Sequence, residues 1–411
     1  MTQTFVIVGA NLAGGRAAEA LRTEGFDGRI VLVGEEPWRP YERPPLSKEL
    51  LWEPDVGLDR FYLQSEEFYA DKEIDLRLGM RAERLDLPGG RVVLQSGENI
   101  AADKILLCTG GSARMLPVPG ADLEGVLCLR TYGDAQILAK GLKPGAKVMI
   151  VGLGVIGGEV AASARKRGCE VTAIEAAPVP MARALGPRFG AWLAGVHRDH
   201  GVALHLGTGV ERFVGEGGKV AGVVTSDGVR HDADMVVVGV GIKPATELAE
   251  GAGLMVDNGI VVDRQCRTSN PQIFAAGDVA NQPGFLDGRI RLETFQNAQE
   301  QGMAAATAMV GKPVEYRRAP WFWSDQYDLN IQVVGCLPAD ARIIVRGDEN
   351  SQKFAAFFVQ GKFVEGVITV NRPPDMAVGR RLVEQRQEIE AADVLGDESV
   401  QLRSLLARKP A

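Results

Sequence analysis

The feature that most constrains the fold of this 411-residue chain is a strand, turn, helix and strand unit that occurs twice. The first copy begins with "TFVIV" at residues 4–8 and ends with "RIVLVGEE" at residues 29–36, with an alanine-rich helical stretch between them. The second copy, "KVMIVGLGVIGGEVAASARKRGCEVTAIEAAP", occupies residues 147–178. Continuous β-branched runs are typical of parallel strands buried on both faces. The sequence therefore predicts an α/β fold with two parallel sheets.

The second copy carries the glycine spacing of a dinucleotide-binding turn. Gly152 permits a tight turn, Gly154 lets the backbone approach a pyrophosphate, and Gly157 lets the helix pack on the strand. The helix N-terminus offers free N–H groups and a partial positive charge to the phosphates. Glu175 ends the next strand, where its carboxylate can accept hydrogen bonds from a ribose diol. These residues predict a Rossmann-type nucleotide site.

The first copy has the same plan with one substitution. Gly9, Asn11 and Gly14 occupy the three turn positions, and Glu35 is the acid after the second strand. Asparagine is the non-glycine residue that best tolerates positive φ, and its amide can donate to a phosphate. The turn alone is a weak signal, but the strand, the helix, the acid and the second copy support it. We therefore expect two nucleotide sites, and hence two different nucleotides.

Composition narrows the class of protein further. The net charge of −7 argues against nucleic acid as the main partner, although a local basic patch could still dock an acidic protein. The five cysteines are scattered, without a C-x-x-C pair, as in proteins of reducing compartments. The beginning of the chain lacks the pattern of a signal peptide, and its most apolar stretch is too short to span a membrane. We expect a cytoplasmic protein.

Several segments resemble the FAD-dependent, NADH-using ferredoxin reductases of bacterial oxygenase systems, and the resemblance covers essentially the whole chain. The segments that carry it are "RPPLSKELL" (43–51), "LLCTGG" (106–111), "VGLGVIGGEVAA" (151–162), "FAAGDVA" (274–280), "APWFWSDQYDLNIQVVG" (319–335), "RIIVRG" (342–347), "TVNRP" (369–373) and "LGDESV" (395–400). The departure is Asn11, where these reductases often carry glycine.

The resemblance implies a glutathione reductase-like fold with two Rossmann-type nucleotide-binding domains and a C-terminal α+β domain. A discontinuous FAD domain would comprise residues 1–112 and 245–320, with the NAD domain inserted at residues 113–244. Residues 321–411 would form the C-terminal interface domain, with strands at "RIIVRG", "FAAFFVQ" and residues 362–370.

The resemblance also implies roles for single residues. The residues expected to bind FAD are Gly9, Asn11, Ala13, Gly14, Glu35, Arg43, Lys48, Ala82, Arg130, Asp278 and Phe295. Those expected to bind NADH are Gly152, Gly154, Val155, Ile156, Gly157, Glu175 and Arg183. Lys48 would lie beside the N5 region of the isoalloxazine, and Glu159 near the nicotinamide, as the two catalytic residues. Glu175 would disfavour the 2′-phosphate of NADPH, with Arg183 as a partial offset.

Simpler interpretations of these residues remain open at this point. Lys48 could be a solvated surface lysine, and Glu159 could be an acid that interacts with the helix dipole. The aromatic run at residues 321–323 with Tyr327 could be core of the third domain. His197, His200 and His205 lack a cysteine or acid that would complete a metal site, so we expect no metal.

The function that the resemblance implies is electron transfer from NADH through FAD to a [2Fe–2S] ferredoxin, which would supply a Rieske dioxygenase or a haem monooxygenase. The ferredoxin would dock near Arg317, Arg318, Trp321 and Trp323, because Trp and Arg are typical interface anchors. A disulfide reductase would need a cysteine pair near residues 40–50, and that stretch has none. A peroxide-forming NADH oxidase and a flavoprotein of the apoptosis-inducing type remain as alternatives.

Overall fold

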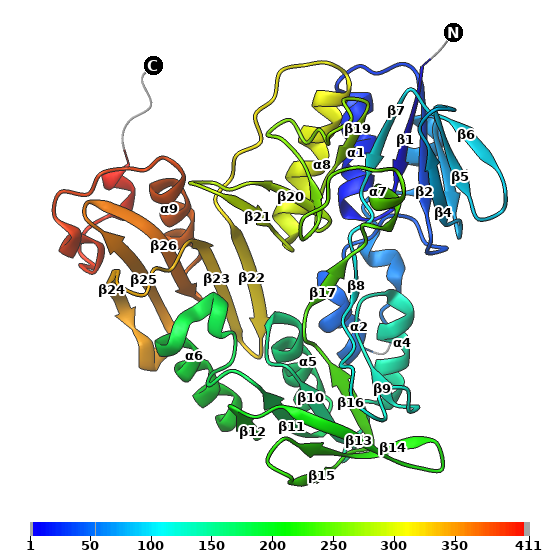
Figure 1. Ribbon diagram of the computed structural model, residues 1–411. Helices are drawn as coiled ribbons and strands as arrows, with labels where there is room; N and C mark the ends of the chain where they lie inside the picture. The colour runs from blue at the N-terminus through cyan, green and yellow to red at the C-terminus, as the bar shows by residue number, and fades with distance from the viewer. Residues whose placement is uncertain (1–2, 54, 407–411) are drawn as a thin grey trace. The chain divides into compact units, whose positions relative to one another are not determined.

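The computed structural model describes residues 3–53 and 55–406, which form two compact units (Figure 1). The first unit contains Met1–Pro44, Gly57–Ser112 and Ile242–Arg318. The second contains Pro45–Val56, Ala113–Gly241 and Ala319–Ala411. The chain therefore passes between the units several times, and each unit is assembled from segments that are far apart in the sequence.

The first unit is built on a parallel five-stranded sheet with the strand order β19-β7-β1-β2-β3. Its strands are β1 (Thr4–Val8), β2 (Arg29–Gly34), β3 (Ile74–Leu78), β7 (Lys104–Leu107) and β19 (Ile273–Ala275). In β1, Val8 pairs with Val33 of β2 on one side and with Leu107 of β7 on the other. The central strand is thus buried between neighbours, as its continuous β-branched run predicts.

Alternate side chains of this sheet enter two different cores. On one face, Ile7 and Leu32 pack with helices α1 (Leu12–Thr23) and α8 (Phe295–Met309), which lie side by side in Figure 1. On the other face, Val6 and Val33 pack with α7 (Glu247–Gly251) and with the small sheet of β4 (Ala82–Asp86), β5 (Arg91–Leu94) and β6 (Asn99–Ala101). The remaining elements of this unit are α3 (Glu66–Asp71), β17 (Ile242–Pro244), β18 (Ile260–Val261), β20 (Ala280–Pro283) and β21 (Arg289–Arg291), with β8 (Gly111–Ala113) at the unit boundary.

The second unit begins with a parallel sheet in the order β12-β11-β10-β16-β9. Its strands are β9 (Val126–Leu127), β10 (Lys147–Val151), β11 (Glu170–Glu175), β12 (Val202–Leu206) and β16 (Met235–Val238). Its helices are α2 (Glu49–Trp52), α4 (Tyr132–Gly141), α5 (Val155–Lys166) and α6 (Ala182–Asp199). An antiparallel sheet of β13 (Val210–Glu216), β14 (Lys219–Thr225) and β15 (Arg230–Asp232) supplies Phe213 and Val223 to the same core.

The C-terminal part of the second unit is an antiparallel sheet in the order β22-β23-β26-β25-β24. Its strands are β22 (Trp321–Gln326), β23 (Leu329–Gly335), β24 (Arg342–Asp348), β25 (Lys353–Gln360) and β26 (Phe363–Val370), followed by helix α9 (Pro373–Glu384). The three strands expected near residues 342, 354 and 362 are confirmed as β24, β25 and β26.

Helix α6 shares a hydrophobic core with this C-terminal sheet. Phe189 stacks on Phe354 with ring centroids 5.7 Å apart, and Trp192 meets the same ring edge-on. This common core explains why the inserted segment and the C-terminal segment form one compact unit, whereas the sequence suggests two domains. Residues 45–56 also belong to this unit, although the sequence division places them in the FAD domain. The three-domain division remains a prediction.

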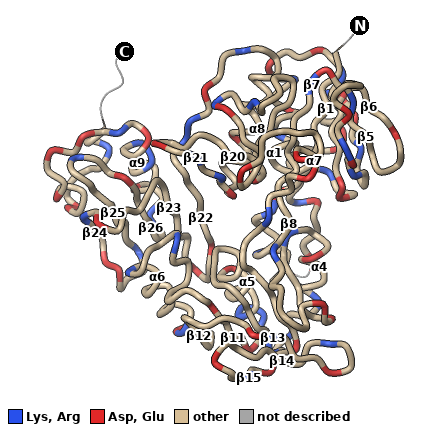
Figure 2. The backbone as a smooth tube through the Cα atoms, in the orientation of Figure 1, with Lys and Arg blue, Asp and Glu red and all other residues tan. Residues whose placement is uncertain are grey.

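Charged residues of both signs occur throughout the described chain (Figure 2). Figure 2 shows basic and acidic residues interspersed along the backbone of each unit. Among the described residues, no helix combines the length and the apolar composition needed to cross a bilayer.

Candidate active site

The first glycine turn is fixed by two close backbone approaches. Gly9 has φ +118°, and a Cβ on it would lie 2.1 Å from the carbonyl oxygen of Cys108. A Cβ on Gly14 would lie 2.0 Å from the carbonyl oxygen of Gly9. Real Cβ atoms do not approach that closely, so both positions require glycine. The turn thus has the tight geometry that the sequence predicts.

Asn11 occupies the middle position of this turn for a different reason from the one expected. Its φ is −116°, so the expected positive φ is wrong. Asn11 is instead the N-cap of α1: its Oδ1 accepts from the N–H of Gly14 at 3.3 Å, and its Nδ2 donates to the Cys108 carbonyl at 2.5 Å. Asparagine is among the preferred N-cap residues. Its side chain therefore ties α1 to the end of β7.

The second turn repeats this geometry but leaves its helix uncapped. Gly152 has φ +92°, and a Cβ on Gly157 would lie 1.9 Å from the Gly152 carbonyl oxygen. Gly154 is the N-cap of α5 without a side-chain hydrogen bond, and nothing lies within 4 Å of its added Cβ. Val155 and Ile156 follow as the first residues of the helix, and Ile156 is 41% exposed. This N-terminus has both free N–H groups and room for an anion.

Glu175, at the end of β11, binds the second turn directly. Its Oε2 accepts from the N–H of Leu153 at 2.7 Å, and its Oε1 accepts from the N–H of Ala177 at 2.8 Å. The carboxylate is therefore held beside the turn, where the ribose of a dinucleotide would lie. Arg183 is exposed in the first turn of α6. The nucleotide-binding roles of Glu175 and Arg183 stay a prediction.

Three more predicted residues of the first unit, Ala13, Asp278 and Phe295, lie on or near α1 and α8. A Cβ on Gly302 of α8 would lie 2.3 Å from the carbonyl oxygen of Ala13, so the two helices cross almost in backbone contact. Gly277, which precedes Asp278, has φ +82°, and its added Cβ would lie 3.1 Å from the Cβ of Ala13. Phe295 is the first residue of α8. Asp278 is thus brought next to the first glycine turn.

Arg43 belongs to a polar group that also contains Glu36 and Tyr41, which were not predicted from the sequence. Its guanidinium contacts Glu36 Oε1 at 2.7 Å, and the Tyr41 hydroxyl donates to Glu36 Oε2 at 2.7 Å. Burial lowers the pKa of Arg43, but Tyr41, Glu36 and Asp278 outweigh it, so the net shift is upward. The predicted acid Glu35, in contrast, is largely exposed and lies 3.7 Å from the guanidinium of Arg81.

Two predicted FAD-binding residues lie farther along the chain. Ala82 begins β4, is 8% exposed, and pairs with Leu94 of β5. Arg130 belongs to the second unit, where its backbone N–H donates to the Asp134 side chain in front of α4.

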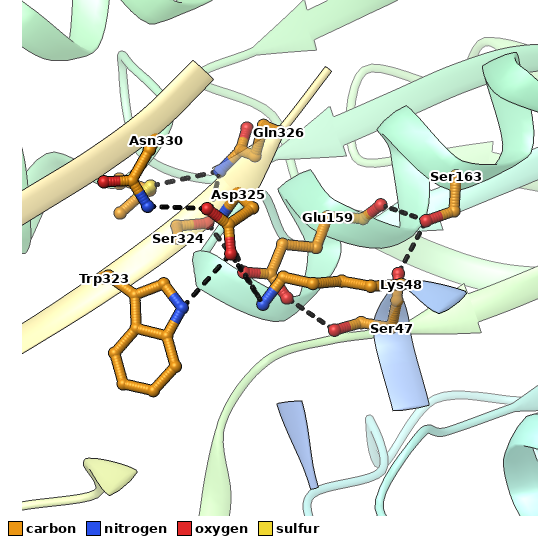
Figure 3. A network of polar contacts seen from close by, with 10 residues as sticks. Ser47, Lys48, Glu159, Ser163, Trp323, Ser324, Asp325, Gln326 and Asn330 are labelled. Atoms are coloured by element: carbon orange, nitrogen blue, oxygen red, sulfur yellow. Dashed lines mark hydrogen bonds and ion pairs between the residues drawn. The ribbon is translucent and has the colours of Figure 1, made fainter. Parts of the chain in front are cut away.

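The second unit contains a buried charged cluster, shown in Figure 3. The Lys48 ammonium lies 3.2 Å from Glu159 Oε1 and 3.4 Å from Asp325 Oδ2. Lys48 is 6% exposed and Glu159 2% exposed, so the interpretation of Lys48 as a solvated lysine is wrong. Glu159 lies beyond the first turn of α5, which contains no acid, so it is not an acid of the helix N-terminus. The structure therefore brings the two predicted catalytic residues together.

Several neutral donors surround the Glu159 carboxylate. Oε2 accepts from the Ser47 hydroxyl at 2.5 Å, and Oε1 accepts from the Ser324 hydroxyl at 2.9 Å. The backbone N–H of Asp325 also points at Oε1, at 3.3 Å. Burial raises the pKa of Glu159, while Lys48, Ser47 and Ser324 oppose the rise. Sequence reasoning missed Ser47 and Ser324.

The signal that could have found Ser324 is the alternation of side chains between the two faces of β22, which places Ser324 and Gln326 on the same face. Ser324 and Gln326 are both fully buried, although a buried strand face normally carries apolar residues. The opposite face carries Trp321 and Trp323, whose rings stack with centroids 5.4 Å apart. Both tryptophans are partly exposed, so they are not simple core.

The basic residues before β22 already have partners. Arg317 donates to the carbonyl of Phe285 at 2.8 Å, and Arg318 forms an ion pair with Glu300 at 2.8 Å. A third guanidinium, that of Arg380, lies 4.6 Å from the ring centroid of Trp321. Arg380 could not be singled out from the sequence, because it lies on α9, far along the chain from Trp321.

Two of the histidines lie against Tyr327. His197 Nδ1 is 2.8 Å from the Tyr327 hydroxyl, and the His200 ring stacks on the Tyr327 ring with centroids 3.7 Å apart. His205 lies against His231 instead. Within residues 3–53 and 55–406, no group of three or more His, Cys, Asp or Glu side chains could hold a metal ion.

Comparison with known proteins adds independent information. Residues 3–302 match the family model described as pyridine nucleotide-disulphide oxidoreductase, and residues 321–406 match the one described as reductase C-terminal. The chain is 42% identical to rhodocoxin reductase of Rhodococcus erythropolis, over 92% of this chain and 89% of that protein. It is 39% identical to the ferredoxin–NAD(+) reductase subunit of the benzene 1,2-dioxygenase system of Pseudomonas putida, over 99% of this chain and 98% of that one. A crystal structure of the covalent putidaredoxin reductase–putidaredoxin complex matches with a TM-score of 0.94 and 37% identity, over 98% of both chains.

Proposed function

Because the chain belongs to the pyridine nucleotide-disulphide oxidoreductase family, we propose that it is an FAD-dependent NADH:ferredoxin reductase of an oxygenase system. Its partner would be a [2Fe–2S] ferredoxin that supplies a Rieske dioxygenase or a haem monooxygenase. Relatives that match nearly full length are named as reductases of such systems, which supports the proposal. Its five free cysteines favour a reducing, cytoplasmic location.

The observation that carries this proposal is the buried Lys48–Glu159 pair in a chain with two nucleotide turns. A disulfide reductase of this fold needs a redox cysteine pair near residues 40–50, and the sequence has none there. That stretch instead supplies Ser47 and Lys48 to the Glu159 carboxylate. A buried charge pair costs desolvation energy, so it is weak support for stability and better support for a role in chemistry.

The residues present fit the two dinucleotides. The uncapped N-terminus of α5 at Gly154 leaves N–H groups for a pyrophosphate, with open space where a Cβ would be. The first turn has the same glycine geometry at Gly9 and Gly14. We assign FAD to the first turn with Glu35, Arg43 and Asp278, and NADH to the second turn with Glu175.

A bound FAD would supply the redox chemistry of the site, which is uptake of a hydride from NADH and release of single electrons. The protein's own residues hold the charged groups of the second unit in place. Glu159 holds the Lys48 ammonium, and the Trp323 ring lies 5.9 Å from the Lys48 nitrogen. The N-terminus of α8 offers a partial positive charge to an anionic ring system.

We place ferredoxin docking on the segment from Arg317 to Trp323. Partly exposed stacked tryptophans beside arginines have the composition of interface anchors. The position of Arg380 over Trp321 adds a cation that could steer an acidic partner. Such steering weakens as ionic strength rises.

Steady-state oxidation of NADH by the purified FAD-loaded protein tests the function. We expect fast turnover with one or more [2Fe–2S] ferredoxins from a panel, little consumption of oxygen without ferredoxin, and no reduction of a disulfide. Rapid peroxide formation without ferredoxin would instead identify an NADH oxidase. Slow turnover with every acceptor would favour the apoptosis-inducing type of flavoprotein, and the proposal would then be wrong.

A further inference from the structure

Three buried side-chain amides of the first unit form a closed ring of hydrogen bonds, which we call the amide ring. Gln282 lies on β20, and Asn297 and Gln301 lie one turn apart on α8. Their exposed fractions are 5%, 3% and 0%. Glutamine and asparagine are mostly exposed in proteins, because a buried amide needs a partner for each of its polar atoms. Three such side chains in contact therefore indicate a role beyond packing.

Each amide of the ring donates to the next one. Gln301 Nε2 donates to Gln282 Oε1, and Gln282 Nε2 donates to Asn297 Oδ1 at 3.0 Å. Asn297 Nδ2 closes the ring by donating to Gln301 Oε1 at 3.4 Å, which is the longest of the three contacts. Every amide nitrogen and oxygen of the ring thus has a partner. Hydrogen bonds aligned in one direction polarise one another, most strongly in a low-dielectric interior.

Two backbone groups fix the direction in which the ring runs. The N–H of Gly277, which can only donate, is 2.8 Å from Gln301 Oε1. The Leu292 carbonyl, which can only accept, receives a hydrogen bond from Asn297 Nδ2 at 3.2 Å. Neither of these two amides can therefore be reversed, and Tyr316 adds a hydroxyl that donates to Asn297 Oδ1 at 3.1 Å. The third amide then has only one orientation that completes the ring.

The amide ring holds one side of the turn formed by Gly277 and Asp278 (the 277–278 turn). Gly277 has φ +82°, a conformation that residues with a side chain rarely adopt. Its N–H is bound by Gln301, and the Asp278 carbonyl accepts from the Arg291 guanidinium at 3.1 Å. A Cβ on Gly277 would lie 3.7 Å from the Cβ of Ala298, so the turn packs against α8. The backbone of this turn is thus fixed from both sides.

The residue after Gln301 brings the amide ring close to the first glycine turn. A Cβ on Gly302 would lie 2.3 Å from the Ala13 carbonyl oxygen, so only glycine lets α8 approach α1 this closely. Ala13 directly precedes Gly14 of the first turn. Gln301 and Gly302 therefore have separate tasks, since one binds the 277–278 turn and the other brings α8 to α1.

We propose that Gln301, held by the amide ring, is a positioning residue that fixes the 277–278 turn for the binding of FAD. The ring itself stands on contacts within the first unit, whereas its consequence for FAD rests on the proposed function, in which Asp278 binds the cofactor. A turn that is fixed before the ligand arrives does not have to be ordered on binding, so preorganisation increases affinity. Gln282 and Asn297 act one step farther away, because they hold Gln301 and not the turn.

Hydrogen exchange in the holoprotein tests the contact between Gln301 and the turn. Mass spectrometry with fragmentation that resolves single residues reports the exchange of the Gly277 N–H. Gln301→Met keeps the side-chain length and removes the amide, so we expect exchange at Gly277 to become about tenfold faster, as for the loss of one buried hydrogen bond. Gln265→Met is the matched control, because it removes another glutamine of this unit, which accepts from Arg267 at 2.8 Å. Exchange at Gly277 that is unchanged in Gln301→Met, or equally faster in the control, would overturn the proposal.

The affinity for FAD shows whether Gln301 acts through Asp278. We expect Gln301→Met to raise the Kd for FAD about tenfold, measured by quenching of flavin fluorescence, and Gln282→Met to raise it less. In an Asp278→Ala background, Gln301→Met should have little further effect, because the side chain that it positions is gone. A merely structural role would raise the Kd by the same factor in both backgrounds, and that result would contradict the proposal.

The two measurements separate a failure of this proposal from a failure of the proposed function. If the extracted flavin proves to be FMN, the consequence for FAD falls with the proposed function, whereas exchange at Gly277 still decides whether Gln301 fixes the turn. If Gln301→Met does not fold, Gln282→Met still weakens the ring while it keeps the contact with Gly277. We then expect faster exchange at Gly277 by a smaller factor than tenfold, and unchanged exchange would overturn the proposal.

Discussion

Replacement of Lys48 by methionine is the sharpest perturbation of the charged cluster, because it removes the only cation shown within 4 Å of Glu159 among the described residues. Glu159 is 2% exposed, so its carboxylate cannot recover full hydration. Removing one partner of a buried ion pair typically lowers the free energy of unfolding by about 3–5 kcal/mol. Three donors remain on Glu159, from Ser47, Ser324 and the Asp325 backbone. We therefore expect the lower end of that range, about 3 kcal/mol at pH 8.

The loss of stability caused by Lys48→Met should become smaller as the pH falls. Burial already raises the pKa of Glu159, and loss of Lys48 removes an opposing effect, so the folded-state pKa rises further. Between the wild-type and variant pKa values, the folded variant holds a proton that the unfolded chain lacks. Lowering the pH through this window therefore restores stability, by about 1.4 kcal/mol per pH unit.

Urea-induced unfolding at several pH values and a fixed excess of FAD, followed by tryptophan fluorescence, measures this cost. Lys48→Met combined with Glu159→Gln should lose the part of the pH dependence that comes from Glu159, since the carboxyl group at position 159 is gone. Lys243→Met, in an exposed pair 3.8 Å from Glu247, is the matched control and should cost less than about 1 kcal/mol at any pH. A cost in Lys48→Met that does not change with pH, or that matches the control, would refute the reasoning.

Three further predictions concern the cofactors and the partner. Chromatography of the extracted flavin should show FAD, because the first turn and Glu35 would bind an adenosine and a pyrophosphate that FMN lacks; recovery of FMN would contradict this. The kcat/KM of the wild-type protein should be higher with NADH than with NADPH, and equal values for the two nucleotides would refute the assignment. Glu175→Ala should bring the two kcat/KM values closer together. The variant should also raise KM for NADH, because it removes the carboxylate that accepts from the Leu153 N–H in the turn. Trp321→Ala and Arg317→Ala should slow reduction of ferredoxin much more than reduction of ferricyanide, which needs no docked surface, and equal slowing would exclude the interface role.

The sequence by itself determined the elements whose cause is local. A glycine at 9, 14, 152 or 157 is required by backbone atoms of its own turn and the neighbouring strand, so the pattern of glycines between apolar strands was sufficient to predict both turns. The buried β-branched runs likewise predicted β1 and β10. Glu175 could be predicted because its carboxylate acts on the turn of its own unit.

Tertiary structure alone decided the features that depend on distant segments. Asn11 caps a helix and has a negative φ, although the intrinsic tolerance of asparagine suggested a positive one. The reason is that the carbonyl of Cys108, just after β7, accepts a hydrogen bond from its side-chain amide. Lys48 is buried in a cluster built from distant parts of the chain. It pairs with Glu159, and Glu159 in turn accepts a hydrogen bond from Ser324. Burial and the partners of a charge are properties of the assembled unit, and no local pattern around residue 48 contains them.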